Sequence, residues 1–159
     1  MVGALVASLP GGAGVLVGDA AGADALVRAA LPTARVFAAA GSQRAELVAR
    51  SVRLVRAVAA APAPRWLVAL AGGPCPAGIT PAAQWRSGRS ASGTWSSAAL
   101  AAGLGVPLLV VWCAPGAVAL PAWTGDWEVC AALPWAPNAG VPTAPVFTWN
   151  PRAAQPALL

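Results

Sequence analysis

The chain has 159 residues, enough for one domain with a substantial core, and carries only 9% charged residues with a formal net charge of +5. It contains no His and no Lys, which excludes a Ser-His-Asp triad, a Cys/His zinc site and any mechanism that depends on a lysine. The positive charge comes from arginine alone and allows a phosphate-bearing partner, although it forms no dense basic run. Any chemistry is left to the arginines, the hydroxyls, the thiols, the backbone amides and five acids: Asp19, Asp24, Glu46, Asp126 and Glu128.

The cysteines and the apolar stretches indicate in which cellular compartment we expect the protein. Cys75, Cys113 and Cys130 are widely spaced, which argues against a disulfide framework or a metal cluster and favours a reducing, cytoplasmic location. We expect each of them to pack as a small buried hydrophobe. Residues 90–125 carry no charge and are long enough to span a bilayer, but glycines and prolines divide them into helix-sized and strand-sized pieces. We therefore expect a buried unit and no membrane contact.

The first half of the chain alternates helical and extended patterns. Apolar residues at helical spacing predict a helix over 2–9, which ends at "PGGAG". A buried strand over 15–17, a helix over 23–31 and a strand over 34–38 follow. A long helix over 41–61 has Ser42 as its expected N-cap and Arg50 largely outside its apolar face. That apolar face is formed by Leu47, Val48, Val52, Val55 and Val58.

The second half continues this alternation and then changes character. We predict a strand over 65–73, a long irregular loop, a helix over 94–103 and a strand over 107–112. The alternation predicts a Rossmann-like α/β domain over 1–112, with a parallel sheet sandwiched by helices. Residues 113–159 are rich in proline and tryptophan and predict an extension packed on the core, with a short edge strand near 146–149. Basic residues are scarce among its tryptophans, which favours packing over base stacking.

Three predicted strand ends are small and polar. The first holds Gly18, Asp19, Gly22 and Asp24, the second is Gly72-Gly73, and the third is Ser92-Gly93-Thr94. In open parallel sheets ligands bind at the carboxyl ends of the strands, and helix N-termini favour anions there. Together the three turns predict a cleft for a nucleotide or sugar phosphate. The simpler alternative is that the two acids and the serine only cap their turns and helices.

The segments "VLVGDAAGADALVRAA", "ARSVRLVRA", "WLVALAGG" and "SGTWSSAALAAGLGVPLLVV" resemble the SLOG superfamily of Rossmann-like proteins, related to DprA and to the LOG phosphoribohydrolases. The resemblance covers roughly residues 1–112 and rests on the order and spacing of the motifs. It implies a nucleotide-derived ligand. On this resemblance Gly18, Gly22, Gly93 and Thr94 contact phosphate, Asp24 holds a ribose hydroxyl, and Arg50 holds a phosphate or carboxylate.

The chain departs from this family in three ways. Ser97 stands where the LOG enzymes carry the glutamate of N-glycosidic cleavage. A long insertion with Trp85, Arg86 and Arg89 separates Gly73 from Gly93 and forms either a lid whose arginines grip phosphate or a disordered surface loop. The first strand of the family is missing, so either the coding start is misplaced or the sheet truly lacks that strand. A missing strand favours association through the exposed edge, and we expect a homo-oligomer.

These observations favour a module that binds a nucleotide or a nucleotide-derived ligand, with no cofactor and no metal. A second hypothesis is a nucleoside monophosphate hydrolase, with Asp24 and Arg50 as its catalytic residues. A third is a DprA-like interaction with single-stranded DNA through arginines on the long helix and in the insertion. These arginines are Arg50, Arg53, Arg56, Arg86 and Arg89. A fourth is a structural or assembly protein with a vestigial site.

Overall fold

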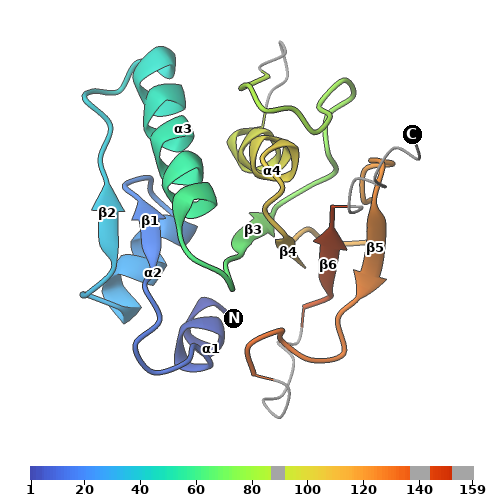
Figure 1. Ribbon diagram of the computed structural model, residues 1–159, viewed down its shortest axis with the longest axis horizontal. Coiled ribbons are helices and arrows are strands. Elements are labelled where there is room, and N and C mark those ends of the chain that lie inside the picture. Colours follow the sequence, from blue (N-terminus) through green and yellow to red (C-terminus); the bar gives the residue numbers. More distant parts are fainter. Residues whose placement is uncertain (87–91, 137–143, 152–159) are drawn as a thin grey trace, which may run out of the picture.

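The computed structural model describes residues 1–86, 92–136 and 144–151, and it is a mixed α/β structure (Figure 1). Four helices are present among these residues: α1 (Val2–Ala7), α2 (Ala23–Ala30), α3 (Arg44–Ala60) and α4 (Gly93–Gly103). The strands are β1 (Leu16–Gly18), β2 (Arg35–Phe37), β3 (Leu67–Ala71), β4 (Leu108–Trp112), β5 (Asp126–Val129) and β6 (Val146–Asn150). The order of helices and strands through β4 confirms the predicted alternation.

The strands form two hydrogen-bonded groups instead of one parallel sheet. β1 pairs with β2 in parallel, and a separate four-stranded sheet has the order β3-β4-β6-β5. In that sheet β3 and β4 are parallel, whereas β6 runs antiparallel to both β4 and β5. The expectation of an edge strand near 146–149 is wrong, because β6 lies between two strands. β5 was not predicted: Trp127 and Val129 favour strands and alternate with two acids, but a pattern of four residues is too short to identify a strand without its partner β6.

The helices lie on both sides of the strands. α3 packs against α4, β1 and β2, and α4 covers β3 and β4 on the same side (Figure 1). α1 packs against α2 on the opposite side. Alternation along the strands therefore fills two clusters: Leu108 and Val110 join the one under α4, while Leu109 and Val111 join a smaller one with Leu5 of α1.

The apolar segment before β4 folds as a buried helix. In α4 the residues from Ala98 to Ala102 are all buried, because strands, α3 and the preceding loop surround it. The loop lies against α4 through a hydrogen bond from Ala82 N to the Ala99 carbonyl oxygen (3.2 Å). In the described part of the chain, no helix is long and apolar enough to cross a membrane.

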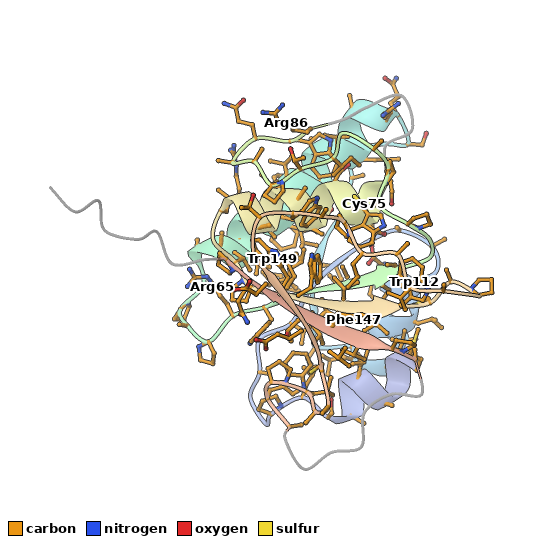
Figure 2. All side chains as sticks on the ribbon, turned by 90° about the vertical axis from the view of Figure 1, so that its right-hand side faces the viewer. Arg65, Cys75, Arg86, Trp112, Phe147 and Trp149 are labelled. Carbon is orange, nitrogen blue, oxygen red and sulfur yellow. The ribbon has the colours of Figure 1, made fainter. Side chains whose placement is uncertain are left out.

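The tryptophans of the C-terminal segment pack, as predicted. Trp123, Trp127 and Trp149 pack against one another with tilted or perpendicular rings, and Trp95 of α4 meets Trp123 edge to face with ring centroids 6.0 Å apart. Figure 2 shows Phe147 and Trp149 on the β6 side of the molecule, where these rings close the core. Each aromatic pair adds about 0.5–1.5 kcal/mol beyond its buried area. The described residues after 112 therefore contribute to the core and add two strands to the sheet.

Three local predictions are wrong. α3 begins after Gln43 instead of Ser42, and Glu46 Oε2 accepts a hydrogen bond from Gln43 N (2.9 Å). Leu47, expected on the apolar face, is 39% exposed, whereas Arg50, expected outside it, is buried. Arg50 is buried because it lies on the inward face of α3, where it meets the carboxylates of Asp19 and Asp24. The cysteines are free thiols, but Cys75 and Cys130 are only half-buried and Cys113 is exposed.

Candidate functional site

The turn after β1 brings the predicted acids together. β1 ends at Gly18, Asp19 follows at once, and α2 begins at Ala23 with Asp24 in its first turn. Gly22 is the N-cap of α2 with φ = 80°, a conformation that residues with a Cβ rarely adopt. The turn, residues 19–22, has only four residues, and both carboxylates meet Arg50 of α3.

Arg50 bridges the two acids from α3. Its Nη1 lies 3.1 Å from Asp19 Oδ1 and 3.2 Å from Asp24 Oδ2. Arg50 is only 8% exposed, whereas the side chains of Asp19 and Asp24 keep 32% and 33% of their surface in contact with solvent. The guanidinium is thus the buried support of the cluster, and the carboxylates form its accessible surface. Arg50 Nε is also buried and has no hydrogen-bond partner among the described residues.

Backbone groups fix each carboxylate further. Asp19 Oδ2 accepts a hydrogen bond from Ala39 N (2.7 Å), just beyond β2, and this bond, together with the positive charge of Arg50, lowers the pKa of Asp19. Asp24 Oδ2 accepts one from Ala20 N (3.3 Å). Asp19 is therefore held ionised at neutral pH, as a hydrogen-bond acceptor and not as a proton donor.

Gly18 makes room for this arrangement. A Cβ placed on Gly18 would overlap Arg50 Nη1 and Asp24 Oδ2. The expectation was that Gly18 would let a ligand approach the backbone, but what approaches it is the buried guanidinium. Arg28, which sequence reasoning missed, donates from Nη1 to the carbonyl oxygens of Gly18 (2.6 Å) and Ala20 (3.3 Å). Its position one helical turn after Asp24 was the signal that could have identified it.

The other two turns meet at the start of α4. Gly72 and Gly73 follow β3, and the Gly73 carbonyl oxygen accepts a hydrogen bond from Trp95 Nε1 (2.8 Å). Ser92 is the N-cap of α4, and its Oγ accepts from Trp95 N (3.4 Å). Gly93 is exposed and Thr94 half-buried in the first turn, whose N–H groups have no intrahelical partners. α3, which carries Arg50, packs against α4 and so links the two groups of predicted residues.

The arginines proposed for phosphate or DNA contact are divided. Arg50 is committed to the two acids, and Arg53 Nη2 donates to the Ala38 carbonyl oxygen (2.6 Å). Arg86 is exposed, and Figure 2 places it at the top of the molecule, away from the strands. Arg89 lies outside the described residues. The described part of the insertion, residues 74–86, packs on α4 and accepts a hydrogen bond from Trp123 Nε1 at the Ile79 carbonyl oxygen (2.8 Å).

The electrostatics of the two turns differ. The end of β1 carries two carboxylates beside two guanidiniums, the bridging Arg50 and Arg28, so its formal charge is zero and its accessible carboxylate oxygens are hydrogen-bond acceptors. The start of α4 has the amides of its first turn and the positive end of a helix dipole, and this first turn has no acid. One end therefore suits hydroxyl or amine donors, and the other suits an anion.

Comparisons of the chain with protein-family models, with curated proteins and with solved structures give no match.

Proposed function

We propose that the protein binds a nucleotide-derived ligand at the carboxyl ends of β1 and β3. The observation that carries this proposal is the cluster at the end of β1, where a buried Arg50 holds Asp19 and Asp24 while about one third of each aspartate side chain stays exposed. A buried guanidinium that served stability alone would gain little over an apolar side chain. Holding two acceptors in fixed positions is what recognition of a sugar with neighbouring hydroxyl groups requires.

The roles of the residues follow from their surroundings. Asp24 and Asp19 accept hydrogen bonds from ribose hydroxyls, and Arg50 positions them. The phosphate lies at the start of α4, on the amides of Gly93 and Thr94 and the hydroxyl of Thr94, because a helix N-terminus without acids favours an anion, whereas the accessible oxygens at the end of β1 are acceptors. The parallel pairs β1-β2 and β3-β4 support this placement, since ligands of parallel sheets lie beyond the carboxyl ends of the strands.

The proposal is for binding and not for hydrolysis. Ser97 replaces the glutamate that the resemblance would require, and Asp19 is held ionised. Arg50 is tied to two carboxylates, so it acts as a positioning residue instead of a catalytic one. Binding of single-stranded DNA is not proposed, because two of the arginines it would need already bind the protein's own oxygens.

The test is calorimetry and thermal unfolding of the full chain with nucleoside monophosphates, nucleosides, nucleotide sugars and inorganic phosphate. A ligand at about 100 times its dissociation constant stabilises the fold by about 2.7 kcal/mol. We expect Asp24→Asn to weaken nucleosides and nucleotides alike, and Thr94→Val to weaken only the phosphorylated ligands. Glu128→Gln, which removes an acid from β5, is the matched control and should bind as the wild type does. Absence of binding across the panel would refute the proposal.

A further inference from the structure

The two outermost strands lie at opposite ends of the row of strands in Figure 1. β2 pairs with β1 and β5 pairs with β6, and among the described residues neither has a strand on its other edge. Such an edge presents unpaired N–H and C=O groups that template pairing with another chain. Because the two edges face away from each other, they can pair only between two copies of the protein.

The two edges carry opposite charge and similar apolar groups. β2 exposes Arg35 and Val36, which is 47% exposed. β5 exposes Glu128 and Val129, which is 77% exposed. In a chain with a net charge of +5, β5 holds two of the five acids. One edge is therefore basic and the other acidic, and each adds a valine.

On β2 the charge lies on the side of the sheet that α3 covers. Arg35 aligns with Leu16 of β1, which packs against the core cluster containing residues of α3 and α4. Val36 aligns with Val17 and so faces the other side.

On β5 the sides are exchanged. Trp127 packs against the same core cluster, so Val129 lies on the side of α3 and α4, and Glu128 lies on the side facing away from them. A second copy that is rotated by half a turn about an axis across the strands presents its β2 edge with the sides reversed. In this turned-over arrangement Arg35 shares a side with Glu128, and Val36 shares a side with Val129.

We propose that the protein associates with further copies of itself by pairing the β2 edge of one copy with the β5 edge of the next, in the turned-over orientation. Oppositely charged and apolar side chains across a strand pair both stabilise it. The contact joins two different surfaces, so each added copy leaves one free edge of each kind and the assembly stays open-ended. A copy added without being turned over would place Arg35 beside Val129, which the charges disfavour.

The test is sedimentation velocity of the full chain over a wide range of concentration at low salt. We expect the sedimentation coefficient to rise steadily with concentration and to fall toward that of the monomer as salt is added. A wild-type protein that stays monomeric throughout, or forms a closed dimer of fixed size, would overturn the proposal.

Charge exchange identifies the surface. Arg35→Glu and Glu128→Arg change the net charge in opposite directions, yet we expect each alone to abolish association and the double variant to restore it. Arg86→Glu makes the same change as the first variant on an exposed arginine outside both edges (Figure 2) and should associate as the wild type does. Tryptophan fluorescence confirms folding of each variant. Association that either single exchange leaves unchanged, or that the double exchange does not restore, refutes the pairing.

Discussion

Gly18→Ala tests whether the cluster at the end of β1 depends on close packing. The added Cβ would overlap Arg50 Nη1 and Asp24 Oδ2, both at the ends of side chains, so these side chains must move apart while the backbone stays in place. Losing one charge-assisted hydrogen bond costs about 1.5–3 kcal/mol, and replacing glycine by alanine returns about 0.4–1 kcal/mol through the unfolded state. The expected net loss is about 1–2 kcal/mol, or a Tm lower by about 2–8 °C.

The assay is thermal and denaturant unfolding, with Gly3→Ala as the matched control. Gly3 lies in α1 and a Cβ there would meet open space, so alanine should stabilise the helix by about 0.5–1 kcal/mol. Gly18→Ala should also weaken the proposed ligand, since both carboxylates lose their positions. A Gly18→Ala protein as stable as Gly3→Ala would show that Arg50 does not occupy the space beside Gly18, and the reasoning would fail.

Two further changes probe the fold and the charge cluster. Gly103→Ala should destabilise the protein although alanine has the higher helix propensity, because the new Cβ would overlap the backbone of Ala82 and detach the loop from α4. Denaturant unfolding measures the loss of stability, and an increase in stability would contradict this prediction. Asp19 stabilises the fold in its ionised form, because its folded pKa lies below 3.8. Its contribution is therefore present well above the ordinary pKa of an aspartate and is lost as the pH falls through the lowered folded pKa. The difference in Tm between the wild type and Asp19→Asn should shrink in acid, and a difference independent of pH would contradict this.

The order of helices and strands could be predicted from the sequence because local residue patterns indicate local secondary structure. Apolar residues at helical spacing identified α2 and α3, and continuous apolar runs identified β3 and β4, each within a few residues of its observed limits. The helix at residues 93–103 was also found, and its burial agrees with the uniformly apolar sequence.

The pairing of strands that are distant in the sequence could not be predicted from local patterns. β5 carries two acids in four residues and gains its strand conformation from β6. β6 has a clear strand pattern, but whether it lies inside a sheet or at the edge depends on what pairs with its outer side. Propensity says nothing about such partners.

The candidate site divides in the same way. The sequence by itself determined that a chain without His or Lys places Asp19 and Asp24 in one glycine-containing turn, and that Ser92, Gly93 and Thr94 begin a helix. Only the tertiary structure decided that Arg50 turns inward to join both acids, although its place on α3 predicted a solvated face. The physical reason is that a charged side chain is buried only where oppositely charged groups pair with it, and the partners of Arg50 lie 31 and 26 residues away along the chain.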